Sequence, residues 1–302
     1  MGLFKRGLST AFVERLNEEY KPGSWWQRIA DDPQLFIAIR DEYLNVYWKG
    51  NSLLRLRMEE GALIGEAHYK YLLRPDCANP YIPIAGGRPT MGNHADFFFN
   101  DISEVTALKR AADVYAGEEK TGVHKIVMSN PNIIDVEIAF STTNEKSGAR
   151  VAQRIDFAAL KRDGSAWELV LYEAKAFSNP ELRASGEGVP VLNQIEGYRQ
   201  FLRTAKAEIT DSYRTVCGNL LALDGVNNRF GSLQNGLKEI AEGRCKFSVS
   251  DDVRLVVFGY DGDQSCGSVW TAHRQKLFDA LGDKLLLKGD AKGMVRGISS
   301  NA

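Results

Sequence analysis

Three strand-like runs follow one another between residues 132 and 177, and they constrain the fold more than any other part of the sequence. The runs NIIDVEIAF (132–140), ARVAQRIDFAAL (149–160) and SAWELVLYEAKAF (165–177) are rich in branched and aromatic residues. Their connections, STTNEKSG and KRDG, are short and polar. We therefore predict that the three strands are antiparallel neighbours in one sheet.

The segments on either side complete a mixed α/β layer. Residues 103–119 have apolar side chains at helical spacing, with Ser103 as N-cap. Residues 190–206 form an amphipathic pattern, and Pro190 suits the first turn of a helix. Residues 253–260 (VRLVVFGY) read as a buried strand. The expected order is α-β-β-β-α and then a later strand. Further helices are predicted at 228–242 and 268–281.

The N-terminal part of the chain has a different pattern. Residues 9–20 predict a helix, and residues 74–95 are rich in proline and glycine, which is typical of a long connection or a domain boundary. We therefore divide the chain into a smaller β-rich module, residues 1–95, and a second domain, residues 96–302. Short runs of branched and aromatic residues predict a β-meander in this module at 34–40, 42–50, 51–59 and 65–73.

Composition limits the class of protein. The chain has 302 residues and a formal net charge of -1, so a nucleic-acid ligand would need a local positive groove. No window approaches 18 uninterrupted apolar residues and no secretory signal is evident, so we expect no membrane span and a cytoplasmic protein. The four cysteines form no CxxC pair, which disfavours a zinc site or an iron–sulfur cluster.

Charged residues interrupt the second and third apolar runs. The acid in RIDFAAL is Asp156, and LYEAKAF contains Glu173 and Lys175. Side chains alternate between the faces of a strand, so Glu173 and Lys175 share a face. If the strands pair around the KRDG turn, Asp156 lies near Glu173. A Glu–Lys pair is commonly a solvated surface, but charge inside an apolar strand needs a reason. We predict that these three residues form a catalytic cluster.

Two carboxylates and an amine at one place suit phosphodiester hydrolysis. Ionised carboxylates repel each other, and a divalent cation removes that conflict. Oxygen ligands suit Mg²⁺ or Mn²⁺, so Asp156 and Glu173 are the predicted metal ligands. The cation would lower the pKa of a water molecule and stabilise charge on phosphorus. Lys175 would hold the attacking hydroxide or offset the developing charge.

Gln194 and Tyr198 lie four residues apart in the helix that follows these strands, so they share one helix face. A tyrosine at this spacing is commonly a core residue. Gln194 is polar although it stands among Leu192, Ile195 and Tyr198. We therefore predict that the amide and the phenol belong to the catalytic site and contact Lys175, the metal water or a phosphate.

The runs RIDFAAL and LYEAKAF and the later QIEGY resemble the PD-(D/E)XK nuclease superfamily, in particular its RecB-like branch with a Gln-x-x-x-Tyr helix. The resemblance covers roughly residues 100–260. It implies a restriction-endonuclease-like α-β-β-β-α-β core with a mixed sheet and a Mg²⁺-dependent phosphodiesterase. It assigns metal binding to Asp156 and Glu173, catalysis to Lys175, and an auxiliary role to Gln194 and Tyr198.

Other residues are candidates for the same site. Ile155 stands before Asp156 where the family name has proline, which is common in this branch. The family often adds a Glu from the helix before the strands. Glu104 is the candidate and Glu137 the alternative, and each is otherwise a surface acid. Arg154, Arg199 and Arg203 are candidate nucleic-acid contacts, with a solvated surface as the alternative.

These patterns predict a metal-dependent nuclease with DNA favoured over RNA, and one hypothesis makes it an antiviral defence effector that a signal activates. In that case residues 1–95 contact a protein partner or a second copy of the chain. The alternative is a non-catalytic nucleic-acid-binding or scaffold protein that retains a nuclease fold. The sequence does not distinguish endonuclease from exonuclease, and it does not define the oligomeric state.

Overall fold

The computed structural model contains two compact units, each described here by itself. The mixed-sheet unit consists of Met1–Phe4, Glu118–Thr210 and Cys245–Ala302, and the antiparallel-sheet unit consists of Lys5–Gly117 and Asp211–Arg244. The boundary that we predicted between residues 95 and 96 lies outside the described residues. The structure describes residues 4–72, 79–90, 101, 104–143, 150–183, 188–289 and 298.

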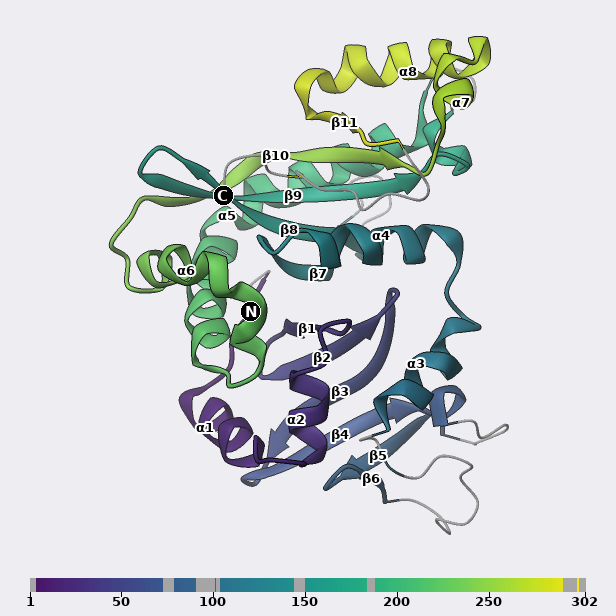
Figure 1. Cartoon of the computed structure of the whole chain (residues 1–302). Coiled ribbons are helices and arrows are strands. Elements are labelled where there is room, and N and C mark those ends of the chain that lie inside the picture. Colours follow the sequence, from purple (N-terminus) through teal and green to yellow (C-terminus); the bar gives the residue numbers. More distant parts are fainter. Residues whose placement is uncertain are drawn as a thin grey trace. The chain divides into compact units, whose positions relative to one another are not determined.

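The antiparallel-sheet unit contains a six-stranded meander in the order β1-β2-β3-β4-β5-β6, in which each strand is antiparallel to the next (Figure 1). The chain reverses at Lys49–Gly50, Glu60–Gly61 and Gly86–Gly87, where both residues have positive φ, as two-residue hairpin turns require. The predicted four-stranded meander is confirmed, but its fourth strand is Ala62–His68, and Tyr69–Leu72, which the predicted strand 65–73 includes, form a 3-10 helix. The strands are β1 Phe36–Ile39, β2 Tyr43–Trp48, β3 Asn51–Glu59, β4 Ala62–His68, β5 Tyr81–Ala85 and β6 Arg88–Pro89.

The last two strands were not predicted. We placed residues 74–95 in a long connection because prolines lack an N–H for the sheet ladder. In the structure, Pro83 nevertheless lies in β5 opposite Glu66 of β4, and its carbonyl oxygen accepts a hydrogen bond from the Thr90 amide at 2.9 Å. A proline can therefore occupy this strand because its carbonyl still takes part in pairing.

Helices cover this sheet, and they include the predicted helix 9–20. Trp25 and Trp26 of the second helix are buried, with 9% and 0% of their surface exposed, so they act as core anchors. The Ser24 hydroxyl caps that helix by accepting from the Gln27 amide at 3.1 Å. The helical elements are α1 Thr10–Glu19, α2 Trp25–Ala30, η1 Tyr69–Leu72, α3 Val105–Asp113, η4 Val226–Leu233 and α6 Gln234–Ala241.

The mixed-sheet unit contains a five-stranded sheet in the order β11-β10-β9-β8-β7. The neighbours β7, β8 and β9 are antiparallel, as predicted, and β9, β10 and β11 are parallel. Gly164, with φ of 58°, forms the turn between β8 and β9. The elements are α4 Glu118–Ser129, β7 Ile133–Thr143, β8 Arg150–Asp163, β9 Ala166–Ala176, η3 Pro180–Leu182, α5 Pro190–Ala222, β10 Phe247–Phe258, α7 Gly262–Cys266, α8 Ser268–Leu281, η5 Gly282–Lys284 and β11 Leu285–Leu287.

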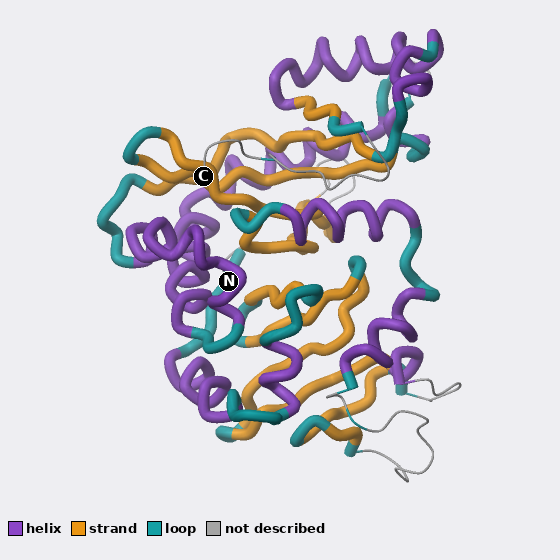
Figure 2. Tube along the Cα trace, in the orientation of Figure 1, coloured by secondary structure: helices purple, strands orange, loops and turns teal. Residues whose placement is uncertain are grey.

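Helices α5 and α4 lie on opposite faces of this sheet, as the purple helices and orange strands of Figure 2 show. The Tyr198 hydroxyl of α5 lies 3.1 Å from the Glu173 carboxylate of β9. Gly122 of α4 lies against the Phe258 ring, and Phe258 pairs with Ala176. Because side chains alternate along a strand, Ala176 and Glu173 point to opposite faces. The unit therefore has an α/β/α layering.

The prediction of one helix over residues 103–119 is wrong, because two separate helices lie in this region. Helix α3 ends at Asp113, and α4 begins separately at Glu118. Gly117 is a poor helix former, whereas Glu118 and Glu119 complement the positive end of a new helix. The helix that precedes the three strands is consequently α4, which the sequence analysis did not identify.

The helix predicted at 190–206 is confirmed but continues well beyond residue 206 in α5. Ile209, Tyr213, Val216 and Leu220 extend its apolar stripe, and each is at most 1% exposed. This spacing of three or four residues keeps one helix face buried. The first part of α5 belongs to the mixed-sheet unit and the remainder to the antiparallel-sheet unit.

Within the described part of the chain, every helix is either too short or too polar to cross a bilayer. Cys217, Cys245 and Cys266 are free thiols, of which Cys217 is buried and Cys266 exposed. The fourth cysteine, Cys77, lies outside the described residues.

The contact between α4 and β10 predicts opposite effects for two glycine substitutions. A Cβ atom on Gly122 would lie 2.0 Å from the Phe258 ring, so Gly122→Ala should reduce the free energy of unfolding by about 1–3 kcal/mol. The matched control is Gly218→Ala in α5, where the nearest atom would lie at 3.7 Å and helix propensity should add about 0.5–1 kcal/mol. Urea denaturation measures both, and a stabilising Gly122→Ala would contradict the close approach of α4.

Candidate active site

Strands β8 and β9 part in the middle of the mixed sheet. Their paired residues run from Asp163–Ala166 to Phe157–Tyr172 and stop there. Beyond this point β8 continues beside β7 only, and β9 continues beside β10 only. The next pair on the ladder would be Asp156 with Glu173. The predicted residues therefore stand where the two strands diverge.

Two carboxylates replace the missing strand as hydrogen-bond acceptors for β9. The Ala174 amide donates to Asp156 Oδ2 at 2.7 Å, and the Ala176 amide donates to Glu119 Oε2 at 3.1 Å. An unpaired backbone N–H in the interior is costly, so each bond stabilises the diverging strands. The side chain of Asn179 also donates to Glu119 Oε2 at 2.7 Å. The opening of the sheet thus depends on acids at these two positions.

Lys175 lies between two acids. Its Nζ is 2.9 Å from Glu173 Oε1 and 2.7 Å from Glu181 Oε2. The side chains of Glu173 and Lys175 are 2% and 9% exposed, whereas that of Glu181 is 46% exposed. Glu181 belongs to η3, directly after β9. The predicted Glu–Lys pair is therefore a buried ion pair with a second, solvent-facing acid.

Gln194 and Tyr198 close over the carboxylates from α5. Gln194 Nε2 donates to the Tyr198 hydroxyl at 2.6 Å. That hydroxyl lies 2.7 Å from the Arg154 carbonyl oxygen and 3.1 Å from Glu173 Oε2. Tyr198 is fully buried, and Gln194 Oε1 is buried with no donor among the described residues. The predicted auxiliary pair contacts Glu173 and leaves an amide oxygen without a partner.

Burial raises the pKa of both acids, Asp156 and Glu173. Loss of hydration, with the nearby Glu173 charge as the second cause, raises the pKa of Asp156 well above its usual range. Loss of hydration also raises the pKa of Glu173 to about 7, although Lys175 and Tyr198 oppose the shift. For Lys175, burial is the largest single effect and lowers the pKa, but the charge and hydrogen bond of Glu173, the hydrogen bond of Glu181 and the charge of Asp156 together outweigh it and the net shift is upward. Burial and the Glu173 charge raise the pKa of Tyr198.

Of the two upstream candidates, Glu137 belongs to this cluster. Its neighbours pair as Val136–Phe157 and Ile138–Ile155, so it stands across the ladder from Asp156, whose pKa its charge raises. Its φ of 52° is unusual for a residue with a side chain. Arg154 Nη1 lies 2.9 Å from the Glu137 carboxylate, with 62% of the Arg154 side chain exposed.

Glu104 belongs to the antiparallel-sheet unit, where it precedes α3. Glu119, which was not among the predicted site residues, is the acid on the helix directly before the strands. Gly117 followed by two acids marks a helix start, and this signal was available in the sequence. We instead extended the helix from Ser103 across that glycine.

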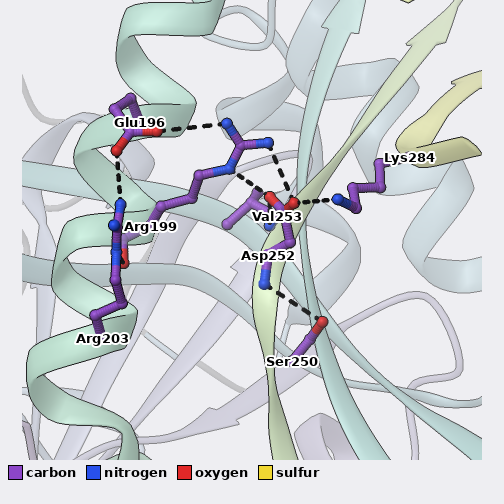
Figure 3. A network of polar contacts seen from close by, with 7 residues as sticks. All are labelled: Glu196, Arg199, Arg203, Ser250, Asp252, Val253 and Lys284. Carbon is purple, nitrogen blue, oxygen red and sulfur yellow. Dashed lines mark hydrogen bonds and ion pairs between the residues drawn. The ribbon is translucent and has the colours of Figure 1, made fainter. Parts of the chain in front are cut away.

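The basic residues Arg199 and Arg203 of α5 are paired with acids, as Figure 3 shows. Arg199 makes two contacts with Asp252 of β10, at 2.5 and 3.2 Å, and Arg203 lies 2.6 Å from Glu196. Lys284 lies 2.5 Å from the same Asp252 carboxylate. Burial alone raises the pKa of Asp252, but these cations outweigh it and lower the pKa. The predicted nucleic-acid contact Arg199 thus joins α5 to β10, whereas Arg203 pairs within α5.

The cluster is suited to hold a cation by the chemistry of its donors. Among the described residues, no group of three or more His, Cys, Asp or Glu side chains is arranged to hold a metal ion. Asp156 and Glu173 supply two oxygen-donor side chains, and the charge of Glu173 raises the pKa of Asp156. The C=O of Ala174 points to the same strand edge as its N–H, which faces Asp156. These are oxygen ligands of the kind that Mg²⁺ and Mn²⁺ prefer.

Comparison with protein-family models, with curated proteins and with solved structures found no match to this chain.

Glu173 predicts a pH dependence of stability. Its folded-state pKa of about 7 exceeds its ordinary value of 4.5, so between these values the folded protein binds more protons than the unfolded chain. The stabilisation from protonated Glu173 is fully present below pH 4.5 and is lost as the pH rises through 7. The loss is on the order of 3 kcal/mol.

Thermal denaturation between pH 4.5 and 8 in EDTA measures this effect. Glu173→Gln should flatten the decline of Tm with pH, because one of the two acids with a raised pKa is gone. Glu168→Gln, at the other end of β9, is the matched control and should keep the wild-type slope. An unchanged slope in Glu173→Gln would contradict the raised pKa.

The role of Glu119 in the opening of the sheet is tested by comparing three variants. Glu119→Ala leaves the Ala176 amide without its acceptor and should cost about 1–3 kcal/mol of unfolding free energy. Glu119→Gln keeps an oxygen acceptor and should cost less. Glu118→Ala removes an exposed acceptor of the Ser178 hydroxyl and should change stability little. A loss in Glu118→Ala equal to that in Glu119→Ala, measured by urea denaturation, would refute the assignment.

Proposed function

We propose that this chain is a metal-dependent nuclease of the PD-(D/E)XK type, acting on phosphodiester bonds with DNA favoured over RNA. The observation that carries the proposal is the convergence of Asp156, Glu173 and Lys175 at the point where β8 and β9 part, with Tyr198 in contact with Glu173. Burying acids in an apolar sheet costs free energy. Acids at such positions are therefore candidates for a functional site.

The order of elements supports the same proposal. The mixed-sheet unit runs α4, β7, β8, β9, α5 and β10, which is the α-β-β-β-α-β order that the resemblance implies. Within that order, Asp156 lies on the second strand, Glu173 and Lys175 on the third, and Gln194 and Tyr198 on the following helix. Glu119 lies on the preceding helix, the element from which the resemblance draws a further Glu.

Each residue has a chemical role in this proposal. Asp156, Glu173 and the Ala174 carbonyl would hold Mg²⁺ or Mn²⁺. The bound cation would stabilise charge on the phosphate and lower the pKa of a water molecule. Lys175 carries a positive charge beside the acids, so it offsets negative charge that develops on the phosphate oxygens. To contact the substrate, its ammonium group gives up one of its two carboxylate contacts. The contact that it gives up is the one with the exposed Glu181.

Tyr198 and Gln194 position the carboxylate of Glu173. The phenol, held by the Gln194 amide, keeps Glu173 Oε2 at a fixed place on the sheet. The free Gln194 Oε1 accepts a hydrogen bond from a water molecule or from a nucleotide group. The exposed Arg154 is the candidate for a phosphate contact beside the cluster.

A cleavage assay tests the proposal. Purified protein should cut DNA with Mg²⁺ or Mn²⁺ and stop with EDTA, and an RNA substrate should be cut more slowly. Asp156→Asn and Lys175→Met should each reduce the rate at least about 100-fold. Asp163→Asn and Lys161→Ala lie on β8 away from the cluster and should keep wild-type activity. Full activity in Lys175→Met would remove the assignment, as would equal losses in the controls.

One observation favours a second function, nucleic-acid binding or scaffolding without turnover. Lys175 is held by two carboxylates, as in a structural ion-pair network. The two functions differ in their metal dependence. Calorimetric titration with Mn²⁺ should detect binding that Asp156→Asn abolishes if the site is catalytic. DNA binding without cleavage under all metals, together with no Mn²⁺ binding, would favour the scaffold.

A cytoplasmic location and a role in antiviral defence belong to the same proposal and stay predictions. So does a protein partner, or a second copy of the chain, that contacts residues 1–95. A nuclease that is silent alone and active only with such a partner would support the defence hypothesis.

A further inference from the structure

The antiparallel-sheet unit has a pocket that the proposed nuclease does not use. Its volume is about 820 Å³, which lies within the range of small-molecule sites. Helix α3 supplies one wall, from Val105 to Ala111, and the turn after α3 supplies Val114 and Tyr115. Lys70 of η1 and Arg28 of α2 complete the lining. All of these residues belong to the same unit.

The charge of the pocket favours an anion. Among the described lining residues, Arg28, Lys70 and Arg110 stand against a single acid, Glu104. Arg28 and Arg110 are exposed and make no ion pair with a described residue. In contrast Lys109, the neighbour of Arg110 on α3, lies 2.7 Å from Asp32. Two guanidinium groups without carboxylate partners are well suited to bidentate phosphate contacts.

The pocket also has an aromatic wall. The Tyr115 ring is 45% exposed, and Val114 beside it is 81% exposed. Lys70 Nζ lies 4.4 Å from the centre of the Tyr115 ring and 4.9 Å from that of Tyr71. The buried Tyr71 ring supports the Tyr115 ring edge-on at 6.1 Å. The Lys70 ammonium therefore lies over a supported aromatic ring. Tyr115 stays partly exposed, so a planar ligand ring can stack against the uncovered part of its surface.

We propose that this pocket binds a free nucleotide. Arg28 and Arg110 contact its phosphates, the base stacks on Tyr115, and the Glu104 carboxylate accepts hydrogen bonds from the ribose hydroxyls, as acids do in other nucleotide sites. The volume of about 820 Å³ suits a small ligand, whereas a nucleic-acid strand needs an extended groove. The inference is independent of the proposed nuclease, because every lining residue lies in the antiparallel-sheet unit.

Isothermal titration calorimetry of the full chain tests the site, with ATP as the probe and EDTA present to keep the proposed metal site out of the measurement. ATP should bind, and inorganic triphosphate and adenosine should each bind at least about tenfold more weakly, because each offers only half of the contacts. Higher salt should weaken ATP binding, since phosphate contacts are screened.

Substitutions separate the two halves of the site. Arg110→Ala should weaken ATP and triphosphate alike by about tenfold or more. Tyr115→Ala should weaken ATP to a similar degree but leave triphosphate binding unchanged. The matched control is Arg244→Ala, an exposed arginine of the same unit paired with Glu242, which should bind ATP like the wild type. Unchanged melting temperatures without ligand establish that each variant is folded.

Several results would overturn the proposal. These are the absence of ATP binding at millimolar concentration, triphosphate binding as tight as ATP, and equal losses in Arg110→Ala and Arg244→Ala. Tighter binding of a short oligodeoxythymidine than of ATP would also overturn it, because the pocket would then belong to a strand-binding surface.

Discussion

The separation of β8 from β9 is the constraint on which the candidate site depends. Once the strands part after Phe157 and Tyr172, the amides of β9 need acceptors that a backbone no longer supplies. Asp156 and Glu119 provide them, and both acids are thereby drawn into the sheet. Glu173, the first residue of β9 beyond the last pair, contacts the Tyr198 hydroxyl of α5 and the Lys175 ammonium. The break in backbone pairing thus places Asp156 and Glu119 at the edge of β9, beside these two residues.

Burial then sets the chemistry of that cluster. Acids that lose hydration hold their protons more tightly, and proximity to one another strengthens this effect. Lys175 limits the effect for Glu173 but does not cancel it. The cluster is therefore most stable when a proton or a cation neutralises part of its negative charge. This physical property connects the geometry to the proposed use of a divalent cation, and it holds whether or not the site turns over substrate.

Two sets of cations among the described residues have different surroundings. Arg199 of α5 and Lys284 of η5 both pair with Asp252 of β10 and so join these elements, whereas Arg203 pairs with Glu196 within α5. Arg28 and Arg110 line a pocket beside an aromatic ring. Arg199 and Arg203 were candidate nucleic-acid contacts from the sequence, whereas Arg28 and Arg110 were not. Arg199 pairs with Asp252 of β10 and with Glu196 one helical turn away, and Arg203 pairs with Glu196 two turns away. Spacing on α5 indicates Glu196 as a partner but not Asp252.

Local patterns determined much of this protein: the three antiparallel strands, the start of α5, the shared face of Glu173 and Lys175, and the pairing of Gln194 with Tyr198. These follow from periodicity and short turns, which act between near neighbours in the chain. Tertiary structure decided the rest. Pro83 lies in a strand because it stands opposite Glu66 of β4 and its carbonyl oxygen accepts from the Thr90 amide. Glu119 belongs to the cluster because α4 packs on the sheet. Asp156 took the place of a backbone partner because β8 diverges there. Such outcomes depend on contacts between distant segments, whose free energies outweigh local propensity.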